Sequence, residues 1–227
     1  MTLAVAHRGD PSVHRENTLA GLRSALRKGA DVVEIDVRLT SDGVPVLLHD
    51  ATLERLWRHD APVASLTADE VFKATGGGVP PLAEALAAVG EHGSARVLLD
   101  LTAADQAAAA VAAVRASGLG ERAYYCGALA AIGRVRALDP AAEIALTWKT
   151  SARPAPELLA RLAPRWLNLR FGLVDPPTVA WARERGLLVA AWTADWERSM
   201  DRLLGYGVDA ITSNRLDALR RRIGRRG

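Results

Sequence analysis

The stretch NTLAGLRSALRKGADVVEIDV, residues 17–37, decides the fold class of this chain. Over Asn17–Lys28 the leucines recur at i, i+3 and i+7, which predicts a helix with one apolar face, and Gly29 follows as its C-cap. Val32–Val37 is rich in Val and Ile, as strands are. A helix that leads into an apolar strand indicates a parallel sheet covered by helices.

The same alternation runs along the whole chain. The predicted strands are Leu3–Ala6, Val32–Val37, Val44–Leu48, Val97–Leu101, Ala123–Cys126, Ile144–Trp148, Trp166–Phe171, Leu187–Trp192 and Val208–Thr212. The predicted helices are Asn17–Lys28, Leu82–Val89, Ala103–Ala116, Leu129–Leu138, Glu157–Leu162, Thr178–Arg185, Trp196–Tyr206 and Leu216–Ile223. About eight strand–helix units in a chain of 227 residues predict an α/β fold of the (β/α)8 TIM barrel class, as a single domain over residues 1–227.

One strand and one segment depart from this repeat. Val44–Leu48 follows the tight-turn sequence Thr40–Gly43, so we expect a hairpin return and not a separate strand–helix unit. Residues 51–78 form a short polar insertion that we expect to cover the barrel mouth, with one helix beginning at the capping box that starts at Thr67. Gly76–Gly78 is followed by Val-Pro-Pro, which indicates a loop and not a phosphate-cradling turn.

Composition excludes several classes of protein. The formal net charge is +3, and five arginines lie in the last eight residues, where we expect a solvated end and no nucleic-acid partner. Cys126 is the single cysteine, so an internal disulfide and a cysteine-based metal cluster are excluded. No window approaches roughly 18 uncharged apolar residues, and His7 and Arg8 interrupt the first apolar stretch. We therefore expect no transmembrane segment, no signal peptide and a cytoplasmic location.

Carboxylates on neighbouring barrel strands form a candidate metal site. Glu34, Asp36 and Arg38 share one face of a strand because side chains alternate with period two, and Asp100 ends the next barrel strand. Burying carboxylates without a cation is costly, and a divalent cation with oxygen ligands is the simplest partner. An ion pair with Arg38 or Arg8 is the alternative. Asp100 could instead cap the following helix, as could Thr102.

Two histidines also follow predicted strands. His7 and His49 each come at the end of an apolar run beside these carboxylates, and imidazole titrates near neutrality, so the pair can supply an acid and a base. Arg8 favours an anionic substrate. The remaining histidines, His14, His59 and His92, are expected at the surface. The residues alone thus indicate a metal-assisted acid–base enzyme acting in phosphoryl or related transfer.

Several motifs occur in a specific order and spacing. They are Ala6–Gly9, Glu16–Thr18, Gly29–Val37, Thr40–Val46, His49–Arg55, Val79–Leu86, Trp192–Thr193 and Gly207–Asn214. In this arrangement they resemble the glycerophosphodiester phosphodiesterases. The similarity is strong over residues 5–55, recurs at 79–102 and 186–214, and is weak between. Members of that family are (β/α)8 barrels, which agrees with the alternation above.

The resemblance implies a role for each motif residue. His7 and His49 would be the general acid and base, and one divalent cation, Mg²⁺ or Ca²⁺, would be held by Glu34, Asp36 and Asp100. Arg8, Asn17 and Trp192 would bind or support the substrate. The implied activity is hydrolysis of a small phosphodiester to sn-glycerol 3-phosphate and an alcohol, with water or the glycerol hydroxyl as the attacking group.

One position departs from the family pattern. The family's Glu-x-Lys motif is Asp100-Leu101-Thr102 here, so this strand lacks the lysine. Two alternative functions follow: lysophospholipase D activity, favoured by an apolar groove using Trp57, Trp148 or Trp192, or an impaired barrel that binds phosphorylated ligands. Arg8 or Arg170 could supply the missing charge. If one of them does, Thr102→Lys should lower activity, and otherwise it should raise activity.

Overall fold

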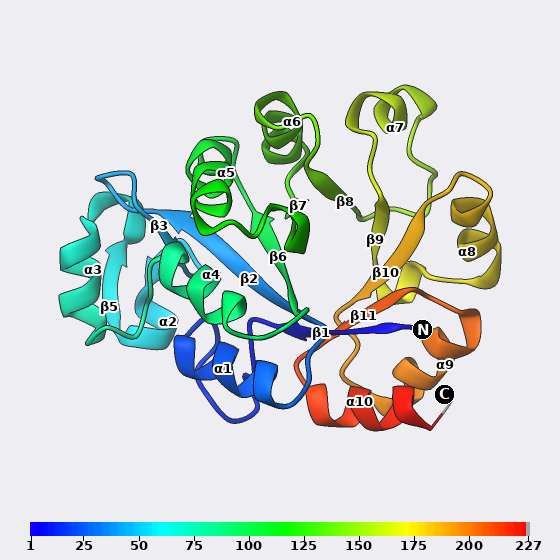
Figure 1. Cartoon of the computed structure of the whole chain (residues 1–227), viewed down its shortest axis with the longest axis horizontal. Coiled ribbons are helices and arrows are strands. Elements are labelled where there is room, and N and C mark those ends of the chain that lie inside the picture. The colour runs from blue at the N-terminus through cyan, green and yellow to red at the C-terminus, as the bar shows by residue number, and fades with distance from the viewer. Residues whose placement is uncertain (226–227) are drawn as a thin grey trace.

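A computed structural model describes residues 1–225 and contains a closed barrel of parallel strands (Figure 1). The barrel strands in chain order are β1 (Leu3–His7), β2 (Val32–Leu39), β6 (Arg96–Leu101), β7 (Ala123–Gly127), β8 (Glu143–Trp148), β9 (Trp166–Arg170), β10 (Leu188–Trp192) and β11 (Ala210–Ser213). Pairing of β1 with both β2 and β11 closes the ring. The predicted (β/α)8 class is confirmed.

Helices cover the outer face of the barrel (Figure 1). They are α1 (Leu19–Arg27), α4 (Leu82–Gly90), α5 (Gln106–Ser117), α6 (Leu129–Leu138), α7 (Pro156–Leu162), α8 (Pro176–Arg183), α9 (Glu197–Tyr206) and α10 (Leu216–Gly224). Short 3-10 turns lie at Val63–Ser65, Gly120–Arg122 and Phe171–Leu173.

The start of α5 differs from the sequence-based prediction of Ala103. The Gln106 side chain accepts hydrogen bonds from the backbone N–H groups of Thr102 (2.8 Å) and Ala103 (3.1 Å). These bonds satisfy the donors before the helix, so α5 begins at Gln106. Neither Asp100 nor Thr102 is therefore the helix cap considered above.

Alternation along each strand separates two cores. Residues facing the helices form the larger core, which includes Val33, Ile35 and Leu99. The barrel floor is formed by the inward-facing residues Val5, Val32, Leu98, Tyr124, Ala145, Trp166, Ala190 and Ala210, and Cys126 packs on them from the next inward position of β7. Because side chains repeat with period two, the next inward position on each strand lies above this floor, toward the C-terminal mouth.

The insertion is more ordered than its composition suggests. β3 (Pro45–Leu47) pairs antiparallel with β2, as the hairpin prediction requires. Beyond it lie β4 (Thr52–Leu53), α2 (Glu54–Trp57), β5 (His59–Pro62) and α3 (Ala68–Thr75), and the Thr67–Glu70 capping box is present. Leu53, Val63 and Val71 pack into a small core of their own. The segment lies at the side of the barrel in Figure 1, beside the edge strand β3.

The arginine-rich C-terminus is largely helical and paired. Arg220 lies 3.3 Å from Asp31, and Arg222 contacts Glu197 and Asp201. Arg220, Arg221 and Arg225 are nevertheless exposed, as the prediction of a solvated end requires, and Arg226 lies outside the described residues. None of the helices described over residues 1–225 has the length and apolar character needed to cross a membrane.

Candidate active site

A pocket of about 340 Å³ opens above the barrel floor. Each barrel strand contributes the residue two positions beyond its floor residue. These residues are His7, Glu34, Asp100, Cys126, Thr147, Asn168, Trp192 and Thr212. The apolar floor and the polar layer above it thus come from one alternation repeated around the ring.

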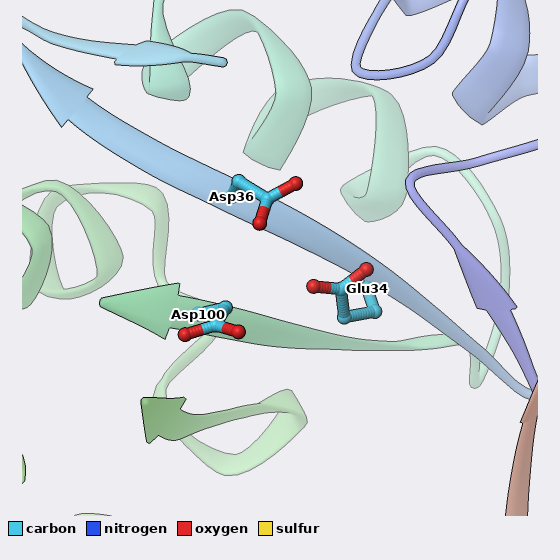
Figure 2. Close-up of side chains that lie close together, drawn as sticks. All are labelled: Glu34, Asp36 and Asp100. Carbon is cyan, nitrogen blue, oxygen red and sulfur yellow. The ribbon is translucent and has the colours of Figure 1, made fainter. Parts of the chain in front are cut away.

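The three predicted metal ligands converge in this pocket. Strand register pairs His7 with Glu34 and Asp36 with Asp100. The carboxylates of Glu34, Asp36 and Asp100 each offer an oxygen, and these oxygens lie within 4.8 Å of one another. Figure 2 shows Glu34 and Asp36 on β2 facing Asp100 on the neighbouring strand.

Burial makes this cluster electrostatically costly without a cation. Desolvation, reinforced by the charges of Asp36 and Asp100, raises the pKa of Glu34 well above its ordinary value. Burial and the charge of Asp36 raise the pKa of Asp100 to about 6. A hard divalent cation with oxygen ligands fits this donor set, since it would offset both the burial and the mutual repulsion.

Arg8 supplies part of the positive charge. Its Nε lies 3.0 Å from Asp36 Oδ2, its Nη1 donates to Glu16 (3.0 Å), and its backbone N–H donates to Glu34 Oε2 (3.0 Å). The ion-pair alternative for the carboxylates therefore holds for Arg8 and Asp36. One guanidinium cannot balance three carboxylates, so the pairing does not remove the need for a cation.

Asn17 lies behind the cluster and does not line the pocket. Its side-chain amide donates to Asp36 Oδ2 (2.7 Å), and its carbonyl oxygen accepts from the Asp36 backbone N–H (3.2 Å). Asn17 is 1% exposed. The structure thus places Asn17 as a support that orients the Asp36 carboxylate, whereas the predicted direct contact with substrate has no geometric support.

The tautomer of His7 is determined by two residues from the loops that follow β10 and β11. Asn214 donates its amide to Asp195 Oδ2 (2.8 Å), which leaves its oxygen to accept from His7 Nδ1 (2.8 Å). His7 Nε2 is then free of a proton and lies 3.9 Å from Glu34 Oε2. Burial lowers the pKa of His7, and the neighbouring Arg8 lowers it further. His7 is therefore suited to act as a base.

The Nδ1 atom of His49 is also held by a hydrogen bond, in this case to the neighbouring residue Asp50. Asp50 accepts from His49 Nδ1 (2.7 Å) and from Arg55 Nε (2.5 Å). The bond from Arg55 lowers the pKa of Asp50 to about 2, so Asp50 is an ionised acceptor at neutral pH. Nε2 of His49 is then the ring nitrogen available to the pocket, which His49 lines.

The surroundings of Thr102 show which cations lie near the position where the family has a lysine. Arg38 Nη1 donates to Thr102 Oγ1 (2.8 Å), and the same guanidinium donates to the His49 carbonyl. Thr102 and Lys149 both line the pocket, whereas Arg170 is exposed and lies outside its lining. Of the two arginines considered, Arg8 is already paired and Arg170 does not reach the site.

Gly127 is required by its surroundings. It has φ +120°, and a Cβ there would lie 2.0 Å from the Leu101 carbonyl oxygen and 2.6 Å from Asp100 Oδ1. We expect Gly127→Ala to displace Asp100 and so to weaken Mg²⁺ or Ca²⁺ binding by at least about tenfold. Backbone strain at this position should also lower the free energy of unfolding by about 1–3 kcal/mol. Titration calorimetry and thermal unfolding would measure both effects. Gly172→Ala, where nothing lies within 4 Å, is the matched control, and equal affinities for the two variants would contradict this prediction.

Comparison with known proteins places this geometry in a family. The model of the glycerophosphoryl diester phosphodiesterase family matches residues 7–218. The chain belongs to this family. It is thus an enzyme of the phosphodiesterase class, as the motifs predicted, and the match spans every pocket residue from His7 to Thr212.

Individual relatives agree with this assignment. The chain is 25% identical over 236 residues to a glycerophosphodiester phosphodiesterase of Caldanaerobacter subterraneus, covering 94% of each chain. It is 47% identical to glycerophosphodiester phosphodiesterase 1 of Rattus norvegicus over 70 residues, which are 31% of this chain and 21% of that protein. The solved structure of an Oleispira antarctica phosphodiesterase in complex with its product sn-glycerol-3-phosphate superposes with a TM-score of 0.84 at 27% identity. That match covers 99% of this chain and 97% of the other.

Proposed function

We propose that this enzyme hydrolyses glycerophosphodiesters to sn-glycerol 3-phosphate and an alcohol, with His7 and His49 as base and acid and with one divalent cation. The observation that carries the proposal is the arrangement of two imidazoles around the carboxylate cluster. Each has its Nδ1 held by a hydrogen bond, to Asn214 or to Asp50, and each keeps Nε2 for the same pocket. The product named in the Oleispira antarctica complex supports the substrate class.

The cation would be held by Glu34, Asp36 and Asp100, for the reasons of charge and burial given above. When bound, Mg²⁺ or Ca²⁺ would neutralise charge on the phosphate and orient the attacking oxygen. The protein's own contribution is to hold the three carboxylates in register, with Asn17 orienting one of them.

Proton transfer uses the Nε2 atom of each histidine, because Nδ1 of each is held by a hydrogen bond. His7 Nε2 accepts the proton of the attacking hydroxyl, which belongs to water or to the substrate's own glycerol, as a phosphorus–oxygen bond forms. In its imidazolium form His49 keeps one proton on Nδ1, bound to Asp50, and donates the other from Nε2 to the alcohol oxygen as the second phosphorus–oxygen bond breaks. When a glycerol hydroxyl attacks first, water must open the resulting cyclic phosphate, and the two histidines exchange roles for that step.

The alternative functions receive little support from the pocket. Of the three tryptophans considered for an acyl-chain groove, Trp192 lines the pocket, whereas Trp57 and Trp148 do not. Trp57 instead lies against the Arg15 guanidinium, 4.1 Å from the ring centroid, and Trp148 Nε1 donates to the Ala152 carbonyl (2.5 Å). The impaired-barrel alternative rested on the missing lysine, and Lys149 places a cation in the same pocket.

A substrate comparison separates these functions. With added Mg²⁺ or Ca²⁺, we expect turnover of glycerophosphocholine at least as fast as that of lysophosphatidylcholine. Turnover confined to lysophosphatidylcholine would replace the proposal by lysophospholipase D activity. Binding of sn-glycerol 3-phosphate with no turnover of either compound would support the impaired barrel.

Thr102→Lys tests how the missing charge has been replaced. The new ammonium would meet the Arg38 guanidinium that now contacts Thr102, and Lys149 lines the same pocket. We expect a fall of about twofold to tenfold in kcat/KM on glycerophosphocholine, because the added ammonium repels the Arg38 guanidinium while water at the exposed Thr102 screens part of this repulsion. Thr102→Val removes the hydroxyl without adding charge and is the control. A higher kcat/KM for Thr102→Lys would show that the site lacks a cation.

A further inference from the structure

Lys149 is the cation that the mechanism above leaves without a role. It follows β8 and lines the pocket that holds the two histidines and the three carboxylates. Thr147 faces the interior, and Lys149 lies two residues beyond it, so period two places both on the same side. Within residues 1–225, no hydrogen bond or ion pair engages the Lys149 ammonium group.

The strand between Asp100 and Lys149 contributes no side chain at Gly127, the position beside Asp100. β7 separates β6 from β8 and ends at Gly127, whose backbone N–H donates to Thr147 Oγ1 (3.2 Å). A Cβ at Gly127 would lie 2.6 Å from Asp100 Oδ1, so the glycine backbone packs against this carboxylate and adds no side chain between it and β8. Asp100, Gly127 and Lys149 line one pocket, so an anion held at the cluster shares that pocket with the Lys149 ammonium.

The other cations around the pocket are already engaged. Arg8 pairs with Asp36 and Glu16, and Arg38 donates to Thr102 and the His49 carbonyl. Arg55 pairs with Glu16 and Asp50, outside the pocket lining. A substrate anion would have to break one of these contacts to gain an arginine, whereas Lys149 has no contact of this kind to lose.

We propose that Lys149 binds a non-bridging oxygen of the substrate phosphate from the β8 side of the pocket and so determines the preference for phosphate-bearing ligands. This assignment rests on the proposed function, because it takes the ligand to be a glycerophosphodiester. Lysine suits the task, since its ammonium is a compact charge on a flexible stem that can follow the phosphate. Lys149 is thus a further substrate-binding residue, placed on a different strand from Thr102.

The test measures binding of sn-glycerol 3-phosphate to the whole chain by titration calorimetry at saturating Mg²⁺ or Ca²⁺. We expect Lys149→Met to raise the Kd about tenfold to a hundredfold, the loss typical of one hydrogen bond to a charged group, and Lys149→Arg to recover most of it. KM for glycerophosphocholine should rise more than kcat falls, because the contact forms in the ground state as well. Lys73→Met, at an exposed lysine of α3 paired with Asp69, is the control for the same change in net charge.

A Kd for Lys149→Met within twofold of the wild-type value would overturn the assignment, as would an equal change in Lys73→Met. So would the absence of sn-glycerol 3-phosphate binding by the wild-type protein. Thermal unfolding with and without Mg²⁺ controls for damage, because the cation should raise Tm of Lys149→Met as it raises Tm of the wild type. Failure of the proposed function is a separate result: the wild type would then bind sn-glycerol 3-phosphate through Lys149 without cleaving glycerophosphocholine.

Discussion

Replacing His7 by alanine is expected to lower kcat on glycerophosphocholine by on the order of 10²–10⁴, the range for one acid–base group. The same loss is expected for His49→Ala. In His7 the lone pair on Nε2 faces the carboxylate cluster because Asn214 and Asp195 hold the proton on Nδ1. Steady-state kinetics at saturating cation would measure the effect, and Tm should change little because neither side chain belongs to the apolar core.

His59→Ala is the matched control, because His59 is exposed on β5 and lies outside the pocket. Near-wild-type kcat in both His7→Ala and His49→Ala would rule out the two-histidine mechanism. A loss in one variant alone would reduce the mechanism to a single acid–base group.

Removing divalent cations should reduce activity to the rate without enzyme, and adding Mg²⁺ or Ca²⁺ should restore it and raise Tm. The rise in Tm should grow with pH. Without a cation, the raised pKa of Asp100, about 6, contributes stability that is fully present below its ordinary pKa and is lost as pH rises through 6. A bound cation would compensate for this loss of stability. It also binds best to deprotonated ligands, so its effect on Tm should be larger at high pH. Thermal unfolding at pH 5 and pH 7.5, with cation or chelator, measures the difference.

Asp100→Asn should flatten this pH dependence and weaken cation binding, whereas Asp60→Asn, at an exposed position of β5, should do neither. Full activity in a metal-free preparation would contradict the assigned cation site. Cation binding that survives in Asp100→Asn at the wild-type affinity would remove Asp100 from the ligand set.

Residues placed by a local rule could be predicted from the sequence. Period two put Glu34 and Asp36 on one strand face, and the placement of His7 and Asp100 at strand ends put them at the barrel mouth. The hairpin return at Val44–Leu48 and the capping box at Thr67 depend on a few neighbouring residues, and both are present in the structure.

Residues placed by closure of the barrel could not be predicted in this way. Asn214 reaches His7 across 207 positions in the sequence, because β11 pairs with β1. Asn214 ends the family motif Gly207–Asn214, and only this motif marks it in the sequence. Lys149 lies in the region of weakest family similarity, and its place depends on the order β6, β7, β8 around the ring. Gln106, which bonds back to Thr102, delays the helix that composition alone would start at Ala103.

The most direct test of the account is product analysis after incubation of the wild-type protein with glycerophosphocholine and Mg²⁺ or Ca²⁺. Cleavage at the alcohol side of the phosphate predicts equal amounts of sn-glycerol 3-phosphate and choline, formed at a rate that chelation abolishes. Release of glycerol and phosphocholine, or an intact substrate with either cation, would contradict it.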